Sequence, residues 1–139
     1  MRVVFDTNIF VSAFAIPGSL SEKAILRIIE GIDTLVLSKD ILDQLLSILS
    51  VKFSRDREEI SRVAVILSEL GEWVTPDIRL DILEDNADNR ILECAIHGRA
   101  DVIVTGDKGM LKLREYGGVK IVSLKKYLEP AIPGSDQGK

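Results

Sequence analysis

Three aspartates in separate parts of the sequence have the residue type and local context of metal-binding carboxylates. Asp6 follows the apolar run at residues 3–5, Asp88 begins an apolar helical pattern, and Asp107 follows the run VIVT. Three carboxylates brought together without basic partners either take up protons or bind a cation. Oxygen ligands favour Mg²⁺ or Mn²⁺ over Zn²⁺, and such ions typically serve phosphate chemistry. The alternative is a set of unrelated caps and turn acids, and spacing alone does not decide.

The N-terminal residues predict how Asp6 is presented. Residues 3–5 are β-branched or aromatic with no polar alternation, which predicts a strand buried on both faces, as in a parallel sheet. Thr7 and Asn8 are turn and N-cap residues, and the apolar residues after them recur at helical spacing. Asp6 therefore stands at the C-terminal end of a strand, the edge at which open α/β sheets bind ligands.

Further strands are expected to alternate with helices along the chain. The expected strands after the first are residues 34–37, 72–75, 101–105 and 119–122, and the longer helices are residues 38–52, 54–70 and 88–97. This alternation predicts an α/β fold, a Rossmann-like three-layer α/β/α sandwich around a mainly parallel five-stranded sheet. In that sheet Asp6 and Asp107 lie at the same edge, and Asp88 starts the helix that leads into the fourth strand.

Length and composition indicate one domain over residues 1–128, followed by a tail at 129–139 that we expect to be disordered. The chain has no apolar run of 18 residues and no signal-peptide pattern, which predicts no membrane association. Its single cysteine, Cys94, forms no internal disulfide, and this suits a cytoplasmic protein. The net charge of −4 argues against generic nucleic-acid binding, but not against a nuclease whose acids hold cations.

The motifs FDTNIFVSA, LSKDILDQL and DNADNRILECAIHGRADVIVTGD together resemble a PIN domain, and in particular the VapC-like toxin proteins of prokaryotes. The resemblance covers residues 1–128 in the family's order and spacing. It implies a Mg²⁺- or Mn²⁺-dependent endoribonuclease that hydrolyses RNA phosphodiesters by a metal-activated water. It also implies the toxin of a type II toxin–antitoxin pair, with an RNA substrate and a cognate antitoxin protein as partners.

Carried over by motif, the resemblance assigns roles to six residues. The expected metal-binding acids are Asp6, Asp88 and Asp107, and the expected polar residues that orient them are Asn8 and Thr105. Asp85 is a further acid expected near the site.

Position 44 departs from the family pattern. The motif S-x-x-hydrophobic-hydrophobic-x-Glu, counted from Ser38, places its glutamate where this chain has Gln44. Helical spacing puts Gln44 beside the apolar face and toward the sheet edge, with Asp40 one turn earlier on the same side and Asp43 on the opposite side. Glutamine is neutral and a weaker ligand, so we expect weaker metal binding and impaired or lost catalysis. The alternative function is therefore a catalytically impaired PIN-like module that binds RNA or protein.

Other features of the sequence indicate partners less directly. Lys108 and Lys112 follow Asp107 and are candidates for RNA phosphate contacts, although such clusters are usually solvated surface. Apolar residues in the helices at 20–29 and 54–70 exceed what one sheet face covers, and would suit a homodimer interface or an antitoxin groove. His97, the only histidine, is expected to be structural.

A phosphotransfer protein is the remaining alternative, because receiver domains and haloacid-dehalogenase-like phosphatases also place aspartate at strand ends. The sequence has Asp-Thr-Asn at the first strand end, without the acidic pair or the Asp-x-Asp pattern of those proteins. Phosphorylation by acetyl phosphate would distinguish them from a PIN nuclease.

Overall fold

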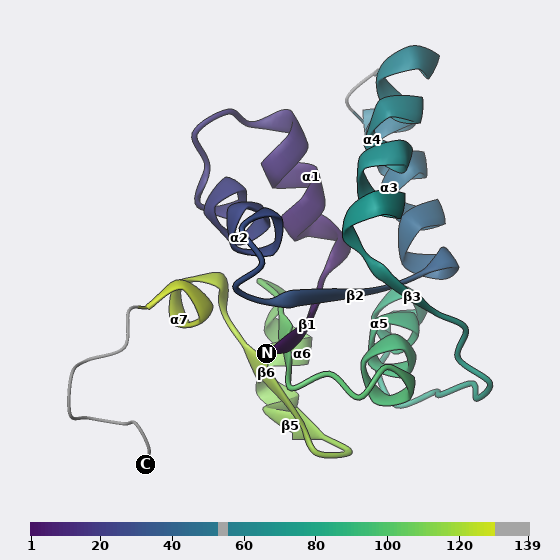
Figure 1. Cartoon of the computed structure of the whole chain (residues 1–139). Coiled ribbons are helices and arrows are strands. Elements are labelled where there is room, and N and C mark those ends of the chain that lie inside the picture. The colour runs from purple at the N-terminus through teal and green to yellow at the C-terminus, as the bar shows by residue number, and fades with distance from the viewer. Residues whose placement is uncertain (53–55, 130–139) are drawn as a thin grey trace.

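A computed structural model describes residues 1–52 and 56–129 of the chain (Figure 1). The expected disordered tail lies outside the described residues, apart from Glu129. The strands of the described part are β1 (Arg2–Phe5), β2 (Thr34–Ser38), β3 (Glu72–Val74), β4 (Val102–Val104), β5 (Glu115–Tyr116) and β6 (Val119–Val122). The helices are α1 (Thr7–Ala15), α2 (Leu20–Ile29), α3 (Lys39–Lys52), α4 (Arg57–Leu70), α5 (Asn86–His97), α6 (Lys108–Leu113) and α7 (Leu124–Leu128).

The strands form one sheet in the order β3-β2-β1-β4-β6-β5. The β3, β2, β1, β4 and β6 strands are parallel, which confirms the predicted α/β class and the mainly parallel sheet. The prediction of five strands was wrong by one, because β5 adds an antiparallel edge strand to β6. This strand has only two residues, too few for a pattern, and its turn uses Gly117 and Gly118 at φ 58° and 86°.

The helices cover both faces of the sheet, as expected for three layers (Figure 1). The chain runs outward from β1 to β2 and β3 through α1 to α4, and returns through α5 to β4 on the other side of β1. Because such crossovers are right-handed, α1 to α4 cover one face, and α5 and α6 cover the other. The central strand β1 is buried between the layers, with Val3, Val4 and Phe5 all inaccessible to solvent.

Helix α7 contacts the N-terminal half of the domain through hydrogen bonds and aromatic packing. The Tyr127 hydroxyl donates a 2.6 Å hydrogen bond to the buried Asp33 carboxylate, which also accepts from Arg27 Nε at 2.9 Å. The Tyr127 ring packs edge-on against Phe5, with 5.7 Å between ring centroids. These contacts make α7 part of the packed core.

No single helix among the described residues is long and apolar enough to cross a membrane. The pair α1 and α2 passes that test of length and composition only when taken together, with a bend of 101° between them.

Candidate functional site

Asp6 stands at the end of β1, where its carboxylate also caps α1. Its Oδ1 accepts from the Asn8 backbone N–H at 3.2 Å, and its Oδ2 accepts from the Thr105 hydroxyl at 2.5 Å. The side chain is buried, at 4% exposure, and burial raises the pKa of Asp6 against the opposing effect of these two hydrogen bonds. The carboxylates of Asp107 and Asp85 raise it further. The Asn8 side chain is exposed and forms no hydrogen bond with the rest of the described chain, so Asn8 orients Asp6 through its backbone.

Thr105 connects two of the predicted site acids. Its hydroxyl donates to Asp6 and accepts from the backbone N–H of Asp107 at 3.0 Å. Thr105 is completely buried at the end of β4, which pairs with β1 in the register that matches Phe5 with Val104. Asp107 caps α6 by accepting from the Met110 N–H at 2.9 Å, and it remains exposed at the sheet edge.

Asp88 lies in the first turn of α5 and faces the same acids. The helix begins two residues earlier than expected, because Asp85 caps it by accepting from the Ala87 N–H at 2.9 Å. Asp88 is buried, at 8% exposure. Burial raises its pKa to about 7, with further contributions from the charges of Asp107, Asp6 and Asp85. The four carboxylates therefore act on one another electrostatically.

A hollow of about 360 Å³ opens beside these acids, lined in part by Asp85, Asp88 and Asp107. Gly109 also lines it, and a Cβ at that position would lie 3.1 Å from Asp107 Oδ2, so glycine leaves room for the carboxylate. Within residues 1–52 and 56–129, none of the four aspartates forms an ion pair with lysine or arginine. The same residues hold no group of three His, Cys, Asp or Glu side chains spaced to bind one metal ion.

The donor set is nevertheless suited to a hard cation. The carboxylates repel one another, have no basic partner in the described chain, and offer only oxygen. A divalent ion would relieve that repulsion, and oxygen-only donors match Mg²⁺ or Mn²⁺.

Gln44 approaches the sheet edge as the helical spacing predicts. Its Oε1 accepts a 2.6 Å hydrogen bond from the hydroxyl of Thr7, the residue after Asp6. Asp40 is exposed and pairs with Arg79 at 3.5 Å, and Asp43 pairs with Lys39 at 2.6 Å on the outer face of α3. The structure thus brings Gln44 beside the first strand end, while Asp40 and Asp43 have partners of their own.

A hydrogen-bonded clamp that the sequence did not reveal holds the loop before α5. The fully buried Asn89 accepts from the backbone N–H groups of Ile82 and Leu83, at 3.0 and 2.8 Å, and donates to the Leu83 carbonyl at 2.9 Å. The buried Glu93, one turn later, accepts from the Leu80 N–H at 2.6 Å. The sequence feature that could have indicated this clamp is the pair Asn89 and Glu93, two polar residues four positions apart on the apolar face of a helix. The clamp fixes the segment that leads to Asp85.

His97 lies at the opposite end of α5 from Asp88, about 13 Å away along the helix axis. Its Nδ1 lies 3.6 Å from Asp77 Oδ1. The structure therefore places the one histidine of the chain outside the carboxylate site.

Comparisons with known proteins match this chain to one family model and to one curated relative. The family model of the PIN domain matches residues 2–109, which contain all the site residues described above. A protein of Methanocaldococcus jannaschii named "Uncharacterized protein MJ1680" is 28% identical over 119 residues, covering 83% of this chain and 76% of that protein.

Among solved structures, this chain is similar to one chain of a crystal structure described as VapBC2 from Rickettsia felis bound to a DNA fragment from the VapBC2 promoter. The TM-score is 0.64 at 19% identity, and the match covers 88% of this chain and 98% of that one. At this level of identity the likeness supports the fold alone.

Proposed function

Because the chain belongs to the PIN domain family, we propose that it is a metal-dependent endoribonuclease that hydrolyses RNA phosphodiesters. The observation that supports this proposal is the group of four aspartates at the C-terminal edge of the sheet. Asp6, Asp85, Asp88 and Asp107 influence one another's charge, and none has a basic partner in the described chain. Such an arrangement favours a bound cation at neutral pH.

We propose that Asp6, Asp88 and Asp107 hold Mg²⁺ or Mn²⁺, with Asp85 as an outer acid. When bound, such an ion activates water and stabilises the negative charge that develops on the phosphate. The chain itself supplies positioning. The Thr105 hydroxyl donates to Asp6 Oδ2 and accepts from the Asp107 N–H at the start of α6. Through these two hydrogen bonds it holds Asp6 and Asp107 in a constant orientation relative to each other. The Asn89 clamp holds the segment that carries Asp85.

The test is cleavage of mixed-sequence RNA oligonucleotides by the purified chain with Mn²⁺ or Mg²⁺. We expect cleavage that EDTA and the variant Asp6→Asn both abolish. Asp43→Asn is the matched control, since it removes a carboxylate on the outer face of α3 and should leave cleavage unchanged. Cleavage that survives EDTA would refute the metal-dependent mechanism.

The second candidate function is a catalytically impaired module that binds RNA or protein. The observation that favours it is Gln44, which offers an amide where the family has a carboxylate and which is engaged by Thr7. Absence of cleavage by a folded wild-type chain, together with cleavage by Gln44→Glu, would support this function and locate the defect.

We further propose that the chain is the toxin of a type II toxin–antitoxin pair and forms a homodimer. The toxin–antitoxin proposal takes up the printed description of the structure with a similar fold, which is a VapBC complex. The proposal of a partner surface rests on a largely apolar hollow of about 360 Å³ between α1 and α2. Leu26 and Ile29, which line that hollow, are 48% and 56% exposed. Expression should slow bacterial growth, and co-expression of a protein from an adjacent small reading frame should relieve it. Light scattering of the purified chain tests the dimer.

A further inference from the structure

A basic surface on α6 adjoins the carboxylate site. Lys108, Lys112 and Arg114 are exposed and, together with Leu111, line a shallow hollow of about 460 Å³. Lys108 and Lys112 are one helical turn apart, so they project from the same face of the helix. None of the three cations forms an ion pair within the described residues. We refer to these four residues as the α6 surface.

The α6 surface and the carboxylate hollow share one short stretch of chain. Asp107 and Gly109 line the carboxylate hollow, whereas Lys108 and Leu111 line the hollow of the α6 surface. Asp107 is also the cap of α6, through its 2.9 Å hydrogen bond with the Met110 N–H. The position of the cations is therefore fixed relative to one of the site acids.

We propose that the α6 surface binds the phosphodiester backbone of the RNA strand next to the phosphate that is cleaved. This inference rests on the proposed function. A chain with net charge −4 and four aspartates at its site repels a polyanion, and cations beside the site offset that repulsion. The half-buried Leu111 lies among the three cations as an apolar contact for a ribose or base.

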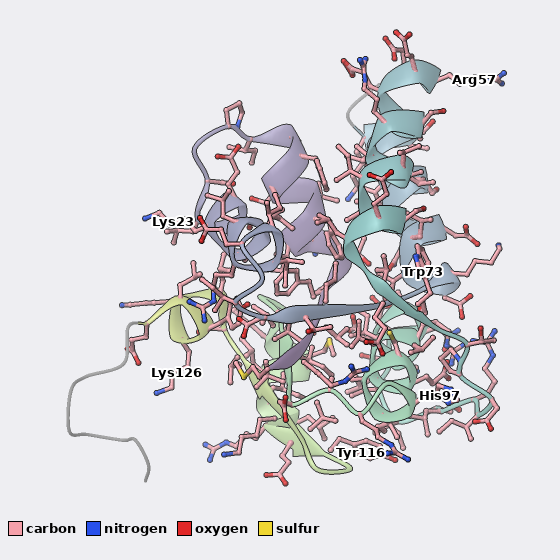
Figure 2. The ribbon with its side chains drawn as sticks, viewed as in Figure 1. Lys23, Arg57, Trp73, His97, Tyr116 and Lys126 are labelled. Atoms are coloured by element: carbon pink, nitrogen blue, oxygen red, sulfur yellow. The ribbon has the colours of Figure 1, made fainter. Side chains whose placement is uncertain are left out.

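The other cations without an ion pair in the described residues lie on elements that carry none of the site acids. Lys23, Lys52 and Arg57 belong to α2, α3 and α4, on the opposite face of the sheet. Figure 2 shows the Lys23 and Arg57 side chains extending away from the body of the protein. Arg99 precedes β4 and lies at the opposite edge of the sheet. Lys120 lies within β6, and Lys125 lies on α7, the helix that packs against α2. The α6 surface is therefore the basic group best placed for a strand that reaches the carboxylates.

The backbone at Arg114 allows a clean test. Arg114 ends α6 with φ at 64°, a conformation that glycine adopts freely and other residues rarely adopt. Arg114→Gly removes the charge without adding strain. Lys108→Ala and Lys112→Ala replace exposed helical side chains, so the triple variant of these three changes should keep the fold.

The experiment measures binding of a fluorescently labelled single-stranded RNA of mixed sequence by anisotropy, in EDTA and over a range of salt concentrations. We expect the triple variant to bind at least about tenfold more weakly than wild type. The slope of log affinity against log salt should fall in magnitude by about 2, since each phosphate contact to a single strand contributes about 0.7. The control variant Lys23→Ala/Lys52→Ala/Arg57→Ala loses the same charge and should bind like wild type. Circular dichroism and thermal unfolding verify the fold of both.

Equal RNA affinity and equal salt slope for the triple variant and the control would overturn the inference, and so would a wild-type chain that binds no RNA. The nuclease proposal is tested separately by measuring RNA cleavage with Mn²⁺. If wild type cleaves RNA while the α6 changes leave binding intact, the inference is wrong and the nuclease remains. If wild type binds RNA through α6 but does not cleave it, the α6 surface is an RNA-binding surface and the nuclease proposal fails.

Discussion

The Thr105 hydroxyl donates a 2.5 Å hydrogen bond to Oδ2 of Asp6, across 99 residues of sequence. The Thr105 hydroxyl oxygen also accepts a hydrogen bond from the backbone N–H of Asp107 at 3.0 Å. One buried hydroxyl therefore joins the ends of β1 and β4 and holds two site acids in a common frame. The bond also lowers the pKa of Asp6, opposing the effect of burial.

Replacing Thr105 by valine preserves shape and removes the hydroxyl. The buried Asp6 carboxylate then loses a donor, so its pKa should rise further and Mn²⁺ binding near neutral pH should weaken. We expect the free energy of unfolding to fall by about 1–3 kcal/mol, the usual cost of a buried group left unsatisfied. Urea denaturation and calorimetric Mn²⁺ titration measure the two effects. Thr105→Ser is the control and should retain both properties, whereas wild-type metal affinity in Thr105→Val would contradict the coupling.

The buried aspartates predict how stability depends on pH. Burial and the neighbouring carboxylates raise the pKa of Asp88 to about 7, from an ordinary value of 3.8. The folded state therefore binds more protons than the unfolded state between these values. The resulting stabilisation is fully present below about pH 4 and is lost as the pH rises through about 7.

The midpoint temperature of the metal-free chain should accordingly fall between about pH 5 and pH 8. Mn²⁺ should raise it at the higher pH and have little effect at the lower one, because protons compete for the carboxylates. Differential scanning calorimetry in EDTA and in Mn²⁺ measures this. Asp88→Asn should flatten the metal-free pH dependence. An equal dependence in this variant would mean that Asp88 does not carry it.

Gln44→Glu should strengthen metal binding. A glutamate accepts the same bond from the Thr7 hydroxyl and adds a charged oxygen at the sheet edge. We expect Mn²⁺ affinity to rise by about tenfold, a typical effect of a group that supports a metal site, and RNA cleavage to accelerate. Calorimetry and oligonucleotide cleavage measure the gain. Gln44→Met keeps the length without an acceptor and should show none, and no gain in Gln44→Glu would place position 44 outside the site.

Asn89→Leu should release the loop before α5. The change leaves the Ile82 and Leu83 N–H groups and the Leu83 carbonyl without their partner. Each such buried group costs about 1–3 kcal/mol, so we expect a loss of about 3 kcal/mol or more in urea denaturation. Limited proteolysis should cut residues 77–85 faster. Asn86→Leu, at an exposed position of the same helix, should have neither effect, and an unchanged cleavage rate in Asn89→Leu would argue against the clamp.

The sequence by itself determined the layered fold and the strand ends at which the acids stand. An unbroken apolar run such as residues 3–5 marks a doubly buried strand, and helical periodicity marks the segments between strands. Both signals lie within single segments of the chain, so they can be recognised without the tertiary structure. The sequence did not predict the edge strand Glu115–Tyr116, because two residues are too few to show an alternating pattern. These residues form a strand only because they pair with β6.

The tertiary structure alone decided how the site residues depend on one another. Motif matching named Asp6, Thr105 and Asp107, but only the register of β1 against β4 places one hydroxyl between them. Likewise, the pKa of Asp88 depends on burial and on charges that come from three other positions in the chain. Hydrogen bonds and electrostatic fields act through space, and the distances between remote segments are set only when the core packs.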